Sequence, residues 1–314
     1  NRYVSYIDNY ARIPVLSKTF PTVPNYHPDM PALACLAQVI GQGKNSILYQ
    51  QLVKTQKAAA SSAFSRMSEL SGEFSIQVTP LPGTSLGAAD SLIYNAFEVF
   101  EKRGVTDDDI AKFKAGIESQ YINGLQSVSG KVSQLAAFQT FTGDANMIGK
   151  LLKQYQAVTK DDVWKAYNKY IKGKNSVTVS VLTKDGKSTA AQPDNYTIDK
   201  TGYTNPDYGY SGLKYVKPTD NFDRTRLPAA GANPVVKVPA VWKKILPNGI
   251  KVMGAANNEI PVVNISVKIP GGHMAMATSP EKLGLPGMTA SMFNEDTKNY
   301  TAEQMAVELQ KLGS

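Results

Sequence analysis

The sequence feature that most constrains the fold is a 58-residue stretch, 183–240, in which hydrophobic periodicity is lost. It holds six prolines, five glycines and five tyrosines, and proline and glycine at this density interrupt helices and strands. We interpret 183–240 as an extended linker with an ordered part of the chain on each side. Tyrosines suit such a linker, because the ring packs against a surface while the hydroxyl stays in water.

The part before the linker has strands near both of its ends and helices between them. Phe74, Ile76 and Val78 alternate with polar residues, which is typical of a half-buried strand. Thr106 with Asp109, and Thr159 with Asp162, resemble the caps that begin helices. The predicted strands are 11–27, 58–67, 73–80 and 175–182, and the predicted helices are 30–40, 47–55, 86–100, 106–138, 144–158 and 159–171.

These elements predict an α+β fold, with an antiparallel sheet packed by helices. The segment 106–138 has an apolar stripe that includes Phe113, Val128, Val132, Leu135 and Phe138, which indicates one buried face. Gly124 and the 127–130 stretch are expected to bend or break this long helix.

Order returns after the linker. A strand is expected over 243–255 around a tight Asn248-Gly249 turn, followed by a second strand over 262–269. Helices are expected over 283–295 and 301–312. We interpret this unit as truncated, since it has few strands, and we expect it to pack against the first domain or to pair with a second copy through open sheet edges.

Composition excludes several classes of function. The net charge is +8, but the lysines are dispersed and no run of four basic residues occurs, so nucleic-acid binding is not expected. The longest apolar stretch, near 32–37, is too short to span a membrane. The single cysteine, Cys35, lies in this apolar run and is interpreted as a buried, inert thiol.

The two histidines, His27 and His273, are 246 positions apart. No helical turn can pair them, so a contiguous zinc motif such as H-x-x-E-H is absent. His27 with Asp29 could form a weak metal site, but a loop role is favoured for both residues. His273 is interpreted as a surface residue.

Several stretches, in order and spacing, resemble the M16 (insulinase/pitrilysin-like) family of zinc metallopeptidases. Before the linker they are 26–52 and Val158-Thr-Lys-Asp-Asp-Val. After it they are Leu246-Pro-Asn-Gly-Ile-Lys-Val, Ile260-Pro-Val-Val and the 284–313 segment. The resemblance implies the M16 peptidase-like (LuxS-like metallohydrolase) fold for the first domain, plus a truncated second α+β unit.

The resemblance also implies a division of the chain. Residues 1–182 correspond to a C-terminal-type, inactive domain closing the first half of a clam-shaped protease. Residues 183–240 correspond to the linker between halves, and residues 241–314 to the start of an N-terminal-type domain opening the second half.

Active members bind zinc through H-x-x-E-H on a helix, whose histidines hold the metal while the glutamate activates water. The equivalent positions here are Gly287, Ala290 and Ser291, none of which can serve as an imidazole ligand or a carboxylate base. Active members also use an arginine and a tyrosine seven residues apart, and these positions are occupied by Val53 and Ala60. No catalytic, metal-binding or cofactor-binding residue is therefore expected in this chain.

Three functions remain open. The resemblance first implies a non-catalytic segment of a zinc endopeptidase that encloses peptides or unfolded protein, with zinc held by the parent's other domains and a periplasmic location in a Gram-negative bacterium. The second is part of a degenerate, non-peptidase homologue that serves as an assembly or peptide-binding partner. The third does not depend on the resemblance. In it, the linker binds a ligand through Tyr203, Tyr208 and Tyr210.

Overall fold

The computed structural model divides into two units, and each is described by itself. One combines Asn1–Thr197 with Val262–Ser314, and the other is Ile198–Pro261. The boundaries at 182 and 240 stay a prediction. The structure describes residues 1–197, 201–202, 207–217, 219, 223, 225–226, 229, 231–233, 235, 238–276, 278–293 and 295–314.

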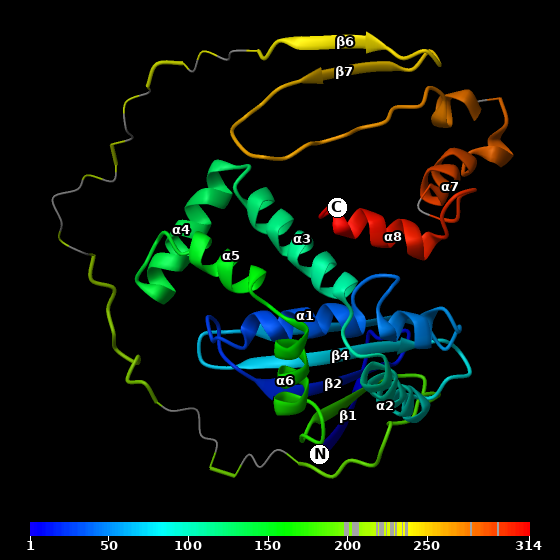
Figure 1. Ribbon diagram of the computed structural model, residues 1–314. Coiled ribbons are helices and arrows are strands. Elements are labelled where there is room, and N and C mark those ends of the chain that lie inside the picture. The colour runs from blue at the N-terminus through cyan, green and yellow to red at the C-terminus, as the bar shows by residue number, and fades with distance from the viewer. Residues whose placement is uncertain are drawn as a thin grey trace. The chain divides into compact units, whose positions relative to one another are not determined.

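A five-stranded sheet in the order β1-β5-β2-β4-β3 is the centre of the first unit (Figure 1). The antiparallel strands expected from the sequence are confirmed. The sequence did not predict β1, which pairs in parallel with β5 and makes one edge of the sheet mixed. The strands are β1 (Arg2–Asp8), β2 (Val15–Thr22), β3 (Ala58–Met67), β4 (Gly72–Pro80) and β5 (Val177–Thr183).

Helix α1 (Met30–Gly41) packs on the sheet because almost every residue in it is apolar and buried. Its end passes very close to β3: a Cβ added to Gly41 would lie 2.1 Å from the backbone nitrogen of Ala63. Only glycine permits this approach. The chain then forms η1 (Tyr49–Val53), a π-helical turn within the helix expected over 47–55.

Helices α2 (Leu86–Arg103) and α6 (Lys160–Tyr170) pack together on the same layer through aromatic rings. The ring of Phe100 lies 4.8 Å from that of Tyr167 and 5.5 Å from that of Trp164, measured between centroids. The Thr159–Asp162 capping box expected from the sequence is confirmed at the start of α6.

The long helical segment expected over 106–138 is two helices, α3 (Asp107–Gly124) and α4 (Val128–Thr142), followed by α5 (Ile148–Gln156). The predicted capping box of Thr106 and Asp109 begins α3. The prediction of one buried stripe was wrong for α4. Phe138 is buried, but Val128, Val132 and Leu135 are exposed, because the break after Gly124 restarts the helix and turns those positions away from the core.

The second unit contains a hairpin of β6 (Val241–Ile245) and β7 (Lys251–Ala255). The predicted turn at Asn248-Gly249 is confirmed: Gly249 has φ +85° and donates its N–H to the carbonyl of Leu246 at 2.9 Å. The predicted strand over 262–269 was wrong. Within the described part of the chain these residues form no ladder, and a strand requires a hydrogen-bonded neighbour.

The described residues of 270–314 form short helices joined by turns, and this segment belongs to the first unit. It contains the short 3₁₀ turns η2 (Gly272–Met276) and η3 (Pro280–Lys282), then α7 (Leu285–Met292) and α8 (Ala302–Lys311). The start of α8 at Thr301 is confirmed, with Gln304 completing its capping box. None of the helices in the described residues is long and apolar enough to cross a membrane.

Candidate functional site

The positions that correspond to the zinc motif lie on α7. Gly287, Ala290 and Ser291 are all exposed, and the hydroxyl of Ser291 donates to the carbonyl of Met288 at 2.8 Å within the same helix. None of these residues carries an imidazole or a carboxylate. The local chemistry of α7 therefore does not fit a zinc ion.

The two histidines lie on separate elements. His27 Nδ1 accepts the backbone N–H of Asp29 at 3.0 Å, and His273 is exposed on η2. The Asp29 carboxylate accepts from Lys169 Nζ at 2.7 Å and from the Tyr170 hydroxyl at 2.6 Å. Burial opposes ionisation of Asp29, but these two hydrogen bonds hold its pKa below the ordinary value. Among the residues that the structure describes, no group of three or more His, Cys, Asp or Glu side chains could hold a metal ion.

The two positions that correspond to the arginine and tyrosine pair are on consecutive elements. Val53 is the half-buried last residue of η1, and Ala60 is exposed on β3 next to an irregularity in the β3–β4 ladder. Ala60 presents only a methyl group, and Val53 an isopropyl group. Neither side chain can donate a hydrogen bond to a substrate.

The sheet has two chemically different faces. The face toward α1, α2 and α6 is buried and carries Leu16, Phe74 and Ile76. Because side chains alternate along a strand, the opposite face carries the intervening residues, many of which are short polar or β-branched. They include Ser17, Thr19, Ser62, Ser75, Gln77, Val177 and Val179. The register also places Phe64, Arg66 and Glu73 on this face, and Ser75 on it is buried.

The register places these residues next to one another on neighbouring strands. Ser17 pairs with Gln77 on one side and with Val179 on the other, and the hydroxyls of Thr19 and Ser75 are 2.8 Å apart. Ala60 belongs to this face, since it pairs with Thr79. We call this surface the open sheet face.

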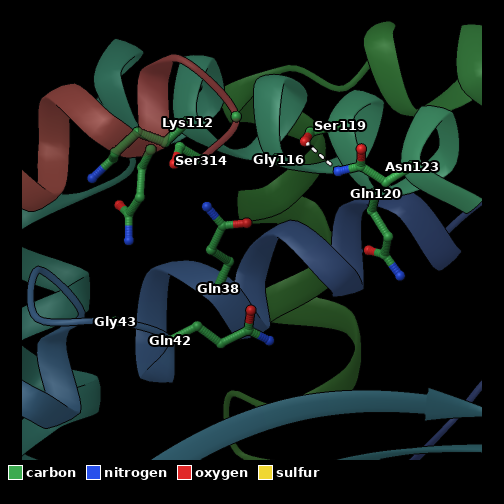
Figure 2. A pocket seen from close by; sticks show the side chains of 11 residues that line it. Gln38, Gln42, Gly43, Lys112, Gly116, Ser119, Gln120, Asn123 and Ser314 are labelled. Carbon is green, nitrogen blue, oxygen red and sulfur yellow. Dashed lines mark hydrogen bonds between the residues drawn. The ribbon is translucent and has the colours of Figure 1, made fainter. Parts of the chain in front are cut away.

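A concave region lies between α1 and α3. One cavity of about 330 Å³ is lined by Gln38, Gln42 and Gln120, together with Asn123 and Gln310. Figure 2 shows Gln38 pointing from α1 toward α3 and Gln120 pointing from α3 toward α1. An adjoining cavity of about 390 Å³ shares Gln38, Gln42, Gly116 and Gln120 with the first, and its far wall is Phe64, Phe113, Ile117 and Tyr155.

The shared lining makes the two cavities one groove, which we call the α1–α3 groove. Sequence reasoning missed it. A usable signal was present, because Gln38 and Gln42 are one turn apart in an otherwise apolar helix, and Gly116 and Gln120 repeat that spacing on α3.

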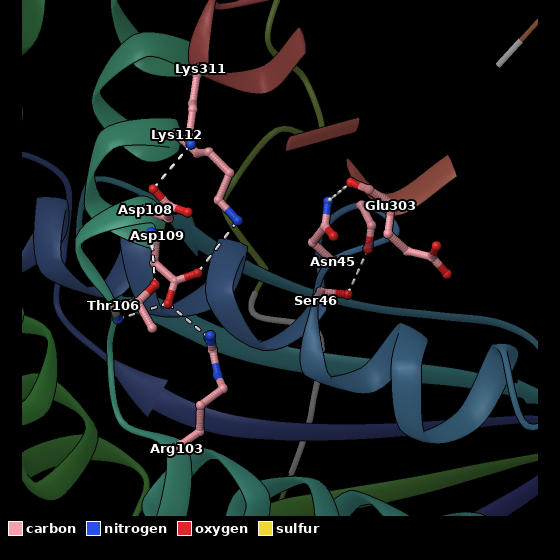
Figure 3. A network of polar contacts seen from close by, with 10 residues as sticks. Asn45, Ser46, Arg103, Thr106, Asp108, Asp109, Lys112, Glu303 and Lys311 are labelled. Carbon is pink, nitrogen blue, oxygen red and sulfur yellow. Dashed lines mark hydrogen bonds and ion pairs between the residues drawn. The ribbon is translucent and has the colours of Figure 1, made fainter. Parts of the chain in front are cut away.

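Helix α8 is attached to α3 and to the α1–η1 connection by polar contacts (Figure 3). Lys311 Nζ is 3.2 Å from Asp108 Oδ1, and the side-chain amide of Asn45 donates to the Glu303 carbonyl at 3.2 Å. Lys54 pairs with the Glu303 carboxylate. The expectation that the segment after the linker packs on the first domain is confirmed for α8.

The remaining candidates are on the linker and in the core. Tyr208 and Tyr210 are exposed and stacked, with ring centroids 5.4 Å apart, while Tyr203 lies outside the described residues. Cys35 is fully buried, as expected, and burial raises the pKa of its thiol to about 12. Such a thiol is a poor nucleophile at neutral pH.

Parts of the chain are similar to known proteins. Residues 1–117 match the family described as "Peptidase M16 inactive domain". The chain is similar to the zinc protease PqqE of Helicobacter pylori, with 29% identity over 155 residues that cover 49% of this chain and 34% of that protein. It is also similar to cytochrome b-c1 complex subunit 2 of Rattus norvegicus mitochondria, with 27% identity over 141 residues that cover 45% of this chain and 31% of the relative.

The fold is similar to that of a protease of solved structure from Helicobacter pylori. The two superpose with a TM-score of 0.52 at 22% identity, over 58% of this chain and 44% of that one. The α+β fold predicted from the sequence is therefore confirmed.

Residues 1–117 therefore resemble an M16 peptidase inactive domain, and the likeness to the solved structure extends to the fold. The resemblance to this family that the sequence motifs carry is confirmed, and the chain is consistent with a fragment of an M16-family protein. It spans about a third of the length of the curated relatives that it matches.

Proposed function

We propose that this chain is a non-catalytic segment of a zinc-dependent M16 endopeptidase. In the parent protein it forms part of the wall of a clam-shaped chamber that encloses peptides, and the linker 183–240 is the hinge between the halves. The observation that carries the proposal is the match of residues 1–117 to an M16 inactive domain. The similarity to a zinc protease supports zinc as the metal of the parent.

The open sheet face supports the wall role. Much of this surface is short hydroxyls, one carboxamide and small aliphatic groups, and its charged residues, Arg2, Asp8, Arg66 and Glu73, balance in sign. A surface without net charge tolerates the varied side chains of peptides. The absent pair at Val53 and Ala60 agrees with a wall that makes no specific contact at the reacting bond.

The division of labour follows from the α7 positions. Gly287, Ala290 and Ser291 offer no zinc ligand on α7, so we place the zinc and the general base in a domain of the parent outside this segment. We propose 1–182 as the inactive domain, 183–240 as the linker and 241–314 as the start of the second half.

The second candidate function is an assembly or peptide-binding role in a homologue that is not a peptidase. The similarity to a subunit of the mitochondrial cytochrome b-c1 complex supports this alternative. Both candidates require that Gly287, Ala290 and Ser291 on α7 neither bind zinc nor act as a base.

The test uses the parent protein with its natural flanking sequence. Hydrolysis of an internally quenched peptide would be measured with and without a zinc chelator. The proposal predicts cleavage that the chelator abolishes and that zinc restores. Absence of cleavage in a zinc-loaded, folded parent would support the assembly role instead.

A further inference from the structure

We propose that the α1–α3 groove binds a short, extended and uncharged stretch of polypeptide. The inference rests on the proposed function only in that the parent handles peptides. It assigns a binding site to this chain, separate from the open sheet face and from any hydrolysis.

The groove has a polar side built from carboxamides. Among the described residues, Gln38, Gln120 and Gln310 make no side-chain hydrogen bond, although all three line the same cavity. Each carboxamide offers one acceptor and two donors, and a peptide group offers one donor and one acceptor. Facing glutamines can therefore hydrogen-bond a peptide backbone whatever its side chains are.

The charge of the groove favours a neutral ligand. Among the described residues that line it, only Lys112 has a charged side chain, and Lys112 Nζ is already 3.5 Å from Asp109 Oδ1. Asp109 also accepts from Arg103 at 2.8 Å and from the backbone N–H of Thr106 at 3.0 Å (Figure 3). No uncompensated side-chain charge in the groove attracts an ionic group.

The other side of the groove is apolar. Phe113 and Tyr155 are buried, with ring centroids 5.9 Å apart, and Ile117 and Phe64 complete the wall. This side suits one aliphatic side chain placed between hydrogen-bonding residues of the ligand. Beside it, the carbonyl of Ala63 on the edge strand β3 accepts from the Gln42 amide at 3.4 Å, so a glutamine of this groove already binds a backbone carbonyl.

Gly116 is independent evidence that no side chain of α3 fills the groove where the two cavities meet. It lies in the interior of α3, where glycine is less favourable than alanine. A Cβ at Gly116 would meet nothing within 4 Å, so packing within the described chain does not require glycine. Gly116 lines both cavities, and any larger side chain would project into the groove where they meet.

The length of the groove fixes the size of the ligand. Lys112 and Asn123 mark its two ends on α3, so at 1.5 Å per residue the groove is roughly 16 Å long. An extended chain rises about 3.3 Å per residue, which corresponds to about five residues.

The test is fluorescence anisotropy with a labelled, blocked pentapeptide, acetyl-Ser-Gln-Leu-Gln-Ser-amide, added to the full chain without zinc. The matched probe acetyl-Ser-Glu-Leu-Glu-Ser-amide has the same shape and two negative charges. We expect the neutral peptide to bind and the charged one to bind about tenfold more weakly, a difference of about 1.4 kcal/mol. No binding of the neutral probe, or equal binding of both probes, would overturn the proposal.

The Gly116→Leu variant should lose at least about tenfold in affinity for the neutral peptide. Its control is Gly149→Leu on α5, where a Cβ also meets nothing within 4 Å. Both variants replace glycine by a better helix former, so both should fold, and far-UV circular dichroism would check this. Unchanged binding by Gly116→Leu, or an equal loss in Gly149→Leu, would place the peptide elsewhere.

The outcome is independent of the peptidase assay. Peptide binding by this chain together with an inactive parent would leave the groove standing and remove the protease proposal. If the parent cleaves peptides but this chain fails to bind the neutral peptide, the protease proposal stands and the groove proposal is removed.

Discussion

Lys18 on β2 and Asp90 on α2 form an ion pair inside the first unit, with Nζ 2.9 Å from Oδ1 and the lysine side chain fully buried. The contact is ionic and not an aligned hydrogen bond, since Asp90 Oδ1 has no hydrogen-bond partner of good geometry among the described residues. Lys18 also donates to Thr178 Oγ1 at 3.0 Å and to the Tyr94 hydroxyl at 3.2 Å. The pair connects the sheet to the helix layer.

Removing one partner should be costly, because it leaves the other charge buried alone. We expect Lys18→Met to lower the free energy of unfolding by about 3–5 kcal/mol. Urea denaturation followed by circular dichroism measures this directly. The double variant Lys18→Met/Asp90→Leu buries no charge and should recover most of the loss, whereas a double variant as unstable as the single one would show that the charge is not the cause.

Stability at alkaline pH should depend on Cys35. Burial raises the pKa of its thiol from 9.0 to about 12 in the folded chain, so the unfolded chain releases this proton first as the pH rises. The contribution of the buried thiol to the free energy of unfolding is complete below pH 9. Above pH 9 it falls by about 1.4 kcal/mol per pH unit. Unfolding of wild type and Cys35→Ala would be compared between about pH 8 and 11. A constant difference between the two proteins over that range would refute the assignment.

The attachment of α8 should depend on charge. In the folded chain the hydrogen bond from Lys54 holds the pKa of Glu303 below its usual value of 4.5. This stabilisation is present above pH 4.5 and is lost as the pH falls, and salt should weaken it further. Hydrogen exchange of the α8 amides should therefore be faster in acid and at high salt.

Variants test the same contact. Lys54→Glu should speed exchange in α8, and Lys54→Glu/Glu303→Lys should restore slow exchange. Lys57→Glu is the control, since Lys57 is nearby on the same turn and makes no ion pair among the described residues. Equal effects of Lys54→Glu and Lys57→Glu would mean that net charge, and not the pair, governs α8.

Gly116→Ala should stabilise the chain. The added methyl group has free space, and alanine is favoured over glycine in a helix interior by about 0.5–1 kcal/mol. Thermal unfolding by circular dichroism would show a higher midpoint. A lower midpoint would mean that a Cβ at this position meets an obstacle, and that the glycine is structural.

Local signals in the sequence predicted most of the first unit. The capping boxes at Thr106 and Thr159 and the alternation of Phe74, Ile76 and Val78 are short-range patterns, and each appears in the structure as expected. Strand β1 was not predicted, because its partner β5 is about 175 residues away along the chain and nothing local specifies a parallel edge.

The candidate sites were harder to predict. The blank positions Gly287, Ala290 and Ser291 come from comparing motifs, and their role stays a proposal. The α1–α3 groove needs two helices to meet, and neither Gln38 nor Gln120 alone differs from an ordinary polar residue. The burial of Lys18 has the same origin, since a lysine within a strand is usually exposed.

The central claim is that this chain, which we propose as a segment of an M16 protein, carries no catalytic metal. Zinc per chain, measured by plasma mass spectrometry on zinc-incubated and desalted protein, tests it most directly. We predict a value near zero for this chain and near one for a parent that includes the zinc-binding domain. A value near one for this chain alone would mean that His27, His273 or a site between two copies binds the metal, and would contradict the account.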